Sequence, residues 1–256
     1  MEEKKNDKPV VSVIMPMHNS AKYLREAIES VRCQTFQDWE LLVVDDASTD
    51  NSVEIAREYT KADSRIRLFV NESPIGIPSA PRNIGLQAAQ GRFIAFLDSD
   101  DIYLPCKLEQ QLALFEKEQA AVVYSNYEKM DEGGIRNNRI IVAPPFTDYK
   151  QMLKGNVITM PAGIYDRSKV GTVLMKSEHH EDYIMWLDIL RQGFRAVNTQ
   201  TVVAIVRVRD TSVSSNKLKA AGWQWNIYRN VEHIPLAKSV YYFVNYAYRA
   251  VKKSLV

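Results

Sequence analysis

The side chains best suited to chemistry gather in short acidic segments, one of which reads Asp98-Ser99-Asp100-Asp101. Two carboxylates placed two residues apart on a turn can face the same crevice. Oxygen ligands of this kind suit Mg²⁺ or Mn²⁺, which keep several waters and bind substrate phosphates. The alternative is a polar turn in which Asp100 or Asp101 caps the following helix, because short acidic turns are common.

A second acidic turn, DDASTD, begins at Asp45. Asp45 or Asp46 can accept a hydrogen bond from the imide N–H of a nucleobase. Ser48, Thr49 or Asp50 is expected to cap the helix that follows. Base recognition and capping do not exclude each other, so both interpretations of this turn stay open.

The elements that must position these turns alternate between apolar runs and amphipathic segments. The runs predicted as buried strands are Val10–Met15, Glu40–Val44, Ile66–Val70, Phe93–Leu97 and Ala121–Tyr124. Helices are predicted after Ser20 and Asp50, which would cap them, over Arg82–Gln90, and after Pro105. This order predicts a Rossmann-like, mainly parallel sheet with helices on both faces.

The polar turns follow the predicted strands at their carboxyl ends. Pro16–Asn19 comes after the first strand, Asp45–Asp50 after the second and Asp98–Asp101 after the fourth. Ligands of such sheets bind in the crevice beyond these strand ends. The second half is less regular, with a hairpin turn predicted at Asp131–Gly134 and a strand at Thr201–Val208.

Composition excludes several classes of protein. The 256 residues carry 33 Lys plus Arg against 31 Asp plus Glu, a net charge of +2, which argues against a nucleic-acid partner. Two cysteines, Cys33 and Cys106, exclude a disulfide-dense scaffold and a cysteine-rich zinc domain. Residues 1–8 have no apolar signal-peptide core, and no apolar run is long enough to span a bilayer. We therefore expect a cytoplasmic protein, with attachment to the inner face of the cell membrane left open.

Five segments in this order resemble the GT-A fold, family 2 glycosyltransferases, which are inverting bacterial enzymes of polysaccharide and lipopolysaccharide synthesis. They read SVIMPMHN, ELLVVDDASTDNS, PRNIGLQAAQG, FIAFLDSDD and HEDYIMWLDIL. The resemblance covers roughly Val10 to Ser215. A P-loop motif and a GxGxxG motif after the first strand are both missing, which weighs against a P-loop phosphotransferase and a dinucleotide dehydrogenase.

The resemblance implies a role for each matching residue in a nucleotide-sugar site. Asp100 would hold Mn²⁺ or Mg²⁺ at the diphosphate, with Asp98 at the ribose or in the water shell of the metal. The other implied contacts to substrate are Pro16, His18, Asp45, Asp46, Arg82, Ser99, Arg207 and Arg209. Of these, Arg207 and Arg209 would close over the diphosphate together with Ser212–Ser215. Family members often carry Tyr where His18 stands.

The resemblance also implies that Asp182 is the catalytic base. Its carboxylate would take the proton from the acceptor hydroxyl as that oxygen attacks the anomeric carbon. Because the pair Glu181-Asp182 opens a predicted helix, the helix N-terminus should favour the ionised form at neutral pH. Glu181 either orients the acceptor or is structural, and Trp186 is either a core residue or a wall of the acceptor pocket.

We expect three parts in the chain. These are a disordered tail at 1–9, a catalytic domain at 10–215 with a nucleotide-binding half at 10–125 and an acceptor-binding half at 126–215, and a helical extension at 216–256. The extension mixes basic and aromatic residues, as interfacial membrane segments do. It therefore contacts a membrane surface, or it packs on the catalytic domain or on a second subunit of a homo-oligomer.

The expected reaction moves a sugar from a UDP-sugar or related donor to a hydroxyl of a saccharide acceptor. A lipid-linked acceptor, such as one on undecaprenyl diphosphate, would make membrane contact useful. Two alternatives stay open. One is a sugar-phosphate nucleotidyltransferase, although its Gly-rich loop is missing after the first strand. The other is a non-catalytic carbohydrate-binding or assembly subunit.

Overall fold

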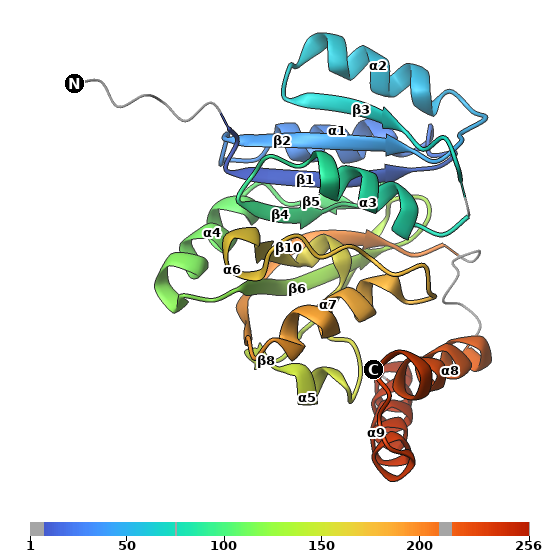
Figure 1. Ribbon diagram of the computed structural model, residues 1–256. Coiled ribbons are helices and arrows are strands. Elements are labelled where there is room, and N and C mark those ends of the chain that lie inside the picture. The colour runs from blue at the N-terminus through green and yellow to red at the C-terminus, as the bar shows by residue number, and fades with distance from the viewer. Residues whose placement is uncertain (1–7, 75, 210–216, 256) are drawn as a thin grey trace.

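The structure is a computed structural model that describes residues 8–74, 76–209 and 217–255 (Figure 1). The disorder predicted for 1–9 lies outside these residues except at Lys8 and Pro9, and the Ser212–Ser215 segment lies wholly outside them. The predicted division of the chain at residue 215 stays a prediction.

The first half of the chain forms a parallel block of four strands. They are β3 (Ile66–Val70), β2 (Trp39–Asp45), β1 (Val11–Met17) and β4 (Phe93–Phe96), in that spatial order. The two central strands and β4 are buried almost throughout, as expected of apolar strands covered on both faces. The four apolar runs that predicted these strands are therefore confirmed.

The second half extends the same sheet in a mixed arrangement. β9 (Ile164–Asp166) lies between β4 and β6 (Val122–Met130) and runs antiparallel to both. β10 (Ala196–Arg207) then runs parallel to β6. The remaining strands pair antiparallel: β5 (Ile102–Tyr103) and β8 (Phe146–Thr147) with β10, and β7 (Arg136–Ile141) with β6.

This arrangement confirms the α/β fold and refines its second half. The Asp131–Gly134 turn forms as predicted, with the Gly134 N–H donating to the Asp131 carbonyl between β6 and β7. The strand predicted at Thr201–Val208 is the latter part of the longer β10. Parallel order ends at β9 because this strand follows the short 3-10 turn Met160–Ala162 rather than a crossover helix.

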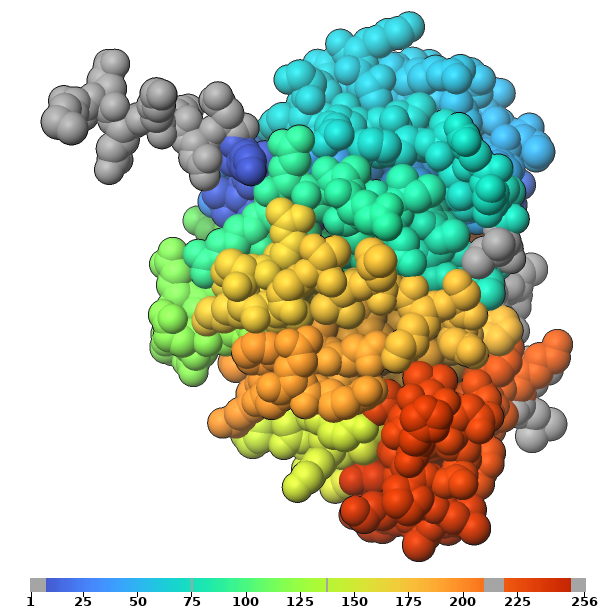
Figure 2. All heavy atoms as spheres, viewed as in Figure 1, coloured from blue at the N-terminus to red at the C-terminus, as the bar shows by residue number. Residues whose placement is uncertain are grey.

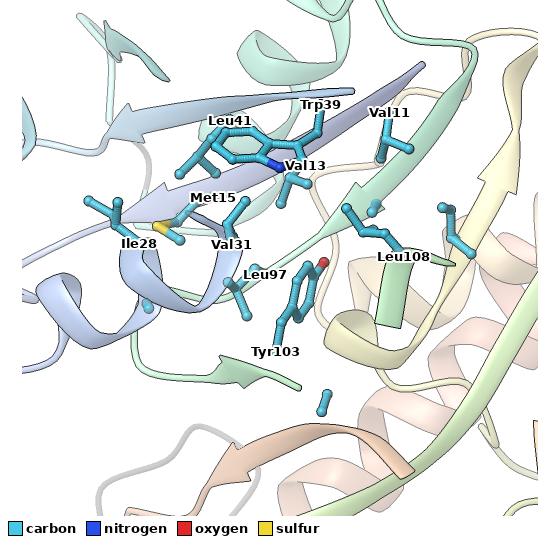
Figure 3. Close-up of a cluster of buried hydrophobic side chains, with 14 of the residues drawn as sticks. Val11, Val13, Met15, Ile28, Val31, Trp39, Leu41, Leu97, Tyr103 and Leu108 are labelled. Carbon is cyan, nitrogen blue, oxygen red and sulfur yellow. The ribbon is translucent and has the colours of Figure 1, made fainter. Parts of the chain in front are cut away.

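Helices cover both faces of the sheet. The bounds are α1 Leu24–Arg32, α2 Ser52–Ala62, α3 Ser79–Ala88, α4 Lys107–Glu118, α5 Tyr149–Met152, α6 Arg167–Val170 and α7 Glu181–Arg191. On one face, Val13 and Met15 of β1 pack with α1 and with Trp39 and Tyr103 (Figure 3). On the other, Ile14 belongs to the cluster that includes α3 and α7.

The expected helix caps differ from those observed. α1 begins at Leu24 without a side-chain cap, and the Ser20 hydroxyl instead lies 2.7 Å from the Ser99 hydroxyl. Asp50 does accept a hydrogen bond from the Ser52 N–H at 3.0 Å, at the start of α2. Ser20 therefore does not cap α1, and its hydroxyl joins the loop after β1 to the loop after β4 at the carboxyl edge of the sheet.

A helical extension follows, as predicted. It consists of α8 (Lys217–Asn226), the π-helix η3 (Ile227–Val231) and α9 (Leu236–Leu255). Trp225 of α8 packs edge-on against Phe243 of α9, with ring centroids 5.4 Å apart. Across the described parts of the chain, every helix is too short or too polar to cross a bilayer.

Candidate active site

The loops after β1 and β2 are tied together at the carboxyl edge of the sheet. The Asp46 N–H donates to the Met17 carbonyl at 2.8 Å, and Nδ1 of His18 lies 2.6 Å from the Asp46 carbonyl oxygen. Asn19 and Ala47 both have positive φ, which allows the two tight turns to meet. The predicted base-pocket residues Pro16, His18, Asp45 and Asp46 therefore lie close together.

The two carboxylates of the β2 loop are held in different ways. Both oxygens of Asp45 accept from the Ser48 N–H at 3.3 Å. Asp46 accepts from the side-chain amide of Asn71 at 2.5 Å, and both of these side chains are buried. His18 is exposed. Sequence reasoning missed Asn71, which follows β3 and offered no motif of its own.

The acidic loop after β4 is anchored at its second and fourth residues. The Ser99 hydroxyl contacts Ser20, and the Asp101 carboxylate accepts from the backbone N–H of Arg207 at 2.8 Å. Both residues are buried. Ser99 therefore joins two loops, and its contact to substrate stays a prediction. The alternative in which Asp100 or Asp101 caps the next helix does not form, since Cys106 is the N-cap residue of α4.

This loop concentrates negative charge. Burial, followed by the charge of Asp98, raises the pKa of Asp100 above its ordinary value. Burial, followed by the charges of Asp98 and Asp100, holds the pKa of Asp101 well above its ordinary value. A cation placed beside Asp98 and Asp100 would relieve this repulsion.

The carboxylates of the acidic loop can supply part of a metal's coordination shell, with substrate and water supplying the rest. Within the described residues, no group of three or more His, Cys, Asp or Glu side chains is arranged to hold a metal ion. Two carboxylates can still hold Mg²⁺ or Mn²⁺ when phosphates and waters complete the coordination. Asp100 meanwhile pairs with Arg209, whose Nη2 lies 2.7 Å from the carboxylate and whose side chain is 43% exposed.

Arg207 is committed to the protein rather than to a ligand. Its side chain is only 2% exposed and pairs with Glu26 of α1 at 2.7 Å. The same guanidinium donates to the backbone carbonyls of Asp100 and Glu132, and it lies over the ring of Tyr23. The prediction that Arg207 closes over a diphosphate is therefore corrected: it braces the acidic loop from behind.

Arg82 joins the acidic loop to the start of α7. Its buried guanidinium pairs with Asp98 at 2.5 Å and with Glu181 at 2.5 Å. Burial opposes the charged form, but Asp98 and Glu181 together raise the pKa of Arg82 above its ordinary value. Both terminal nitrogens of the guanidinium are paired with these carboxylates, while its Nε has no hydrogen-bond partner among the described residues. The contact of Arg82 to a nucleotide-sugar stays a prediction.

Asp182 is next to Glu181 in the first turn of α7. Burial, followed by the charge of Glu181, raises the pKa of Asp182 to about 7, and Arg82 acts in the opposite direction. The Tyr183 N–H at the helix start does favour the ionised form, as expected, but burial and Glu181 outweigh it. A pKa near neutrality matches what proton transfer at neutral pH requires.

The carboxylate of Asp182 lies on the same side of the molecule as the acidic loop. Arg82 contacts both Asp98 and Glu181, the neighbour of Asp182, so the acidic loop and the start of α7 lie close together. The charge of Asp98 raises the pKa of both Asp100 and Asp182. Asp182 also accepts from the Asn156 side-chain amide at 3.3 Å. Asn156 comes from a loop that sequence reasoning did not single out. The structure thus brings a pair of candidate metal ligands and a candidate base into one site.

Trp186 belongs to the core. It is 0% exposed, and its ring lies edge-on to Phe96 with centroids 6.4 Å apart. A Cβ atom built on Gly163 would fall 2.5 Å from this indole, so the backbone there packs directly against the ring. Of the two predicted roles, the wall of an acceptor pocket is therefore excluded.

Comparisons with known proteins identify the family of the chain. A family model described as glycosyl transferase family 2 matches residues 12–168. The putative teichuronic acid biosynthesis glycosyltransferase TuaG of Bacillus subtilis is 38% identical, covering 98% of this chain and 99% of that protein. The UDP-Glc:alpha-D-GlcNAc-diphosphoundecaprenol beta-1,3-glucosyltransferase WfgD of Escherichia coli is 39% identical, covering 96% of each.

Solved structures share the fold. S. aureus TarS 1-349 in complex with UDP-GlcNAc superposes with a TM-score of 0.71 at 21% identity, covering 93% of this chain and 71% of that one. The mannosyltransferase PcManGT from Pyrobaculum calidifontis, in complex with GDP-Man and Mn²⁺, gives 0.67 at 17% identity, covering 98% and 76%. These likenesses confirm the fold expected from the sequence.

Proposed function

Because the chain belongs to glycosyl transferase family 2, we propose that it transfers a sugar from a UDP-sugar to a hydroxyl of a saccharide acceptor with inversion. One observation carries this proposal. Arg82 binds Asp98 of the acidic loop and Glu181 beside Asp182, so the donor side and the base side share one buried ion-pair network. An in-line displacement needs these two sides to face each other across the anomeric carbon.

The donor side would bind the nucleotide through the loops after β1 and β2. Asp45 and Asp46 offer carboxylate oxygens to a base or ribose, and Pro16 and His18 flank them at the same strand ends. The names of two relatives support a uridine nucleotide: WfgD is called a UDP-Glc glucosyltransferase, and TarS was solved with UDP-GlcNAc.

A divalent cation, Mn²⁺ or Mg²⁺, would be held by Asp100 with Asp98 beside it. When bound, it would supply Lewis-acid charge to the leaving nucleoside diphosphate. Arg209 is the nearest basic side chain to Asp100 and is partly exposed, so it would turn from that carboxylate toward the diphosphate. The Mn²⁺ in the PcManGT complex supports this assignment.

The base side would act through Asp182. Its carboxylate would accept the proton of the acceptor hydroxyl while that oxygen attacks the anomeric carbon, and the bond to the nucleotide would break on the opposite face. Because the pKa of Asp182 is about 7, a substantial fraction of the protein would carry the ionised base at neutral pH. Asn156 would orient the carboxylate through its 3.3 Å contact.

The reaction is tested by the release of UDP. The protein is incubated with UDP-sugars, Mn²⁺ and saccharide acceptors, and acceptor-dependent UDP is measured. Asp182→Asn should lose this release while keeping the thermal shift caused by UDP. The matched control is Asp188→Asn on the same helix, where Asp188 pairs with Lys176 and Arg191.

The alternatives give other results. Pyrophosphate released from UTP and a sugar phosphate would identify a nucleotidyltransferase. Sugar binding without turnover under any donor would identify a non-catalytic subunit. Either result would contradict the proposal.

The acceptor is proposed to be lipid-linked, and α9 to contact the inner face of the cell membrane. Its exposed apolar residues repeat every four positions at Leu236, Val240, Val244 and Tyr248, which gives one stripe along the helix. The 20 residues of α9 include no acidic side chain and four basic ones. An apolar stripe on a basic helix suits an anionic lipid surface.

Membrane contact is tested on vesicles of phosphatidylglycerol and cardiolipin. Val240→Ser with Val244→Ser should lower the partition coefficient for vesicles by at least about a hundredfold, because two buried side chains of this size contribute about 1.5–3 kcal/mol each. The control is Ile140→Ser with Val142→Ser, which removes exposed apolar surface elsewhere. Unchanged vesicle binding, or a loss of dimers in its place, would contradict the membrane assignment.

A further inference from the structure

Helix α8 lies against the residues that precede and open α7. The indole of Trp223 stacks on the His179 ring with centroids 4.1 Å apart and planes at 21°. The same indole meets the His180 ring edge-on, with centroids 5.4 Å apart and planes at 75°. Figure 2 shows the C-terminal residues, in red, seated against the orange and yellow surface that includes α7. The extension therefore contacts the two residues directly before Glu181-Asp182.

Further contacts from α8 reach both sides of the base. The Gln224 side chain donates to the Tyr183 hydroxyl at 3.4 Å, and Asn226 donates to Glu178 at 3.5 Å. Tyr183 is buried and donates in turn to the Met152 carbonyl at 2.8 Å. One turn of α8 thus contacts residues before and after Asp182.

The start of α7 lacks a local support of its own. His180 is its N-cap residue, has φ of 62° and makes no side-chain cap. A non-glycine residue in this left-handed region is strained, and a missing side-chain cap leaves N–H groups of the first turn without a partner. Ring contacts stabilise beyond the area that they bury. The two ring contacts of Trp223 therefore support a helix start that lacks a cap.

From these contacts we propose that Trp223 is a positioning residue for the base. It fixes His179 and His180, and through them it sets the direction of the first turn of α7 and of the Asp182 carboxylate. This inference rests on the proposed role of Asp182 as the proton acceptor. The C-terminal extension is then part of the active-site scaffold, whatever else it contacts. A displacement of a reacting group by about 1 Å can cost about a hundredfold in rate.

The test compares two tryptophans on one helix. Trp223→Ala is expected to lower kcat by about 10–100-fold while the KM for the UDP-sugar stays within about twofold. Trp225→Ala removes an indole that contacts Phe243 instead, and it should keep kcat within about threefold. Trp223→Phe retains a ring for the histidines and should recover most of the lost kcat. Equal losses in both alanine variants, or no loss in Trp223→Ala, would overturn the proposal.

A second readout does not need catalysis. Amide hydrogen exchange at residues 181–184 should become faster in Trp223→Ala and remain unchanged in Trp225→Ala, because only the first change frees the start of α7. His179→Ala should cause the same acceleration and add little to Trp223→Ala in the double variant. If the wild-type protein shows no sugar transfer, the proposed function fails while exchange still decides the positioning role. Unchanged exchange in Trp223→Ala would overturn that role by itself.

Discussion

The donor side and the base side of the site are built in different ways. On the donor side, Asp45 is held by the N–H of Ser48, three residues away, and the loops follow consecutive parallel strands. On the base side, Glu181 is held by Arg82, 99 residues away, and the preceding histidines are held by Trp223 from the last part of the chain. The nucleotide loops after β1 and β2 are held within the first half of the chain, although Arg207 and Arg209 reach the acidic loop from the second half. The base side joins segments from the first half to the last part of the chain.

This difference indicates how substitutions should affect each side of the site. A change on the donor side should alter binding of one substrate group and leave the base in place. A change in the long-range contacts of the base side should alter both rate and stability. Arg82 contacts both sides, so a change at this residue is the strongest test of whether the two sides are sensitive in different ways.

The largest effect is expected from Arg82→Ala. It leaves Asp98 and Glu181 without their shared partner, and removing one member of a buried ion pair costs about 3–5 kcal/mol. We expect a lower melting temperature together with at least a hundredfold loss of transfer, measured by calorimetry and UDP release. Arg25→Ala is the control, since its pair with Glu58 is exposed and should contribute little to stability. Native stability and a native rate in Arg82→Ala would show that the donor side and the base side do not depend on their shared ion pair.

A smaller effect, confined to the donor side, is expected from Asp100→Asn. The amide keeps the shape of the side chain but removes the charge that would hold a divalent cation. The rise in melting temperature caused by Mn²⁺ in the presence of UDP should disappear, and chelation of metal should no longer change the rate. Glu118→Gln, an exposed acid on α4, should keep both responses. A full Mn²⁺ response in Asp100→Asn would place the cation elsewhere.

The pH profile should report the base side alone. Because Asp182 must be ionised to accept a proton and its pKa is about 7, kcat should rise through about pH 7 and then level off. Glu181→Gln removes a charge that raises this pKa, so the midpoint should move to lower pH. Stopped assays across this range, with Asp188→Asn as control, measure the midpoint. A midpoint that moves to higher pH would show that Glu181 acts mainly through Arg82.

The smallest effect concerns stability. Since burial raises the pKa of Asp182 above its value in the unfolded chain, ionisation disfavours the folded state. This cost is absent at low pH, grows as the pH rises above about 4, and is complete above about 7. At pH 8, Asp182→Asn should therefore melt about 2–4 °C higher than the wild type for each 1 kcal/mol of this cost. At pH 4, where the cost is absent, the variant and the wild type should melt at the same temperature. A variant that is less stable at pH 8 would contradict a desolvated carboxylate.

The parts predictable from sequence were those set by local pattern. β1, β2, β3 and β4 are short apolar runs between turn residues, and the acidic loops follow them directly. The order of motifs then identified the family. Because these four strands run parallel, the loops that follow them meet at the same edge of the sheet.

The rest depended on contacts that no short segment encodes. Arg207 ends a strand, where an arginine can either face a ligand or brace a loop, and only the position of Glu26 decides. Trp186 has the same helical position in either role, and the approach of Gly163 places it in the core. The pKa of Asp182 depends on how much protein surrounds it, which a helix start alone does not reveal.

The antiparallel insertion of β9 has a consequence for how the protein is made. β4 emerges from the ribosome by residue 96, yet β9, which covers its free edge, is complete only at Asp166. A nascent chain of intermediate length would present an unpaired apolar strand edge, which invites association with other chains. While residues 97–166 are being synthesised, the exposed edge of β4 can therefore associate with other chains. Fragments that end before β9 should need a chaperone to stay in solution.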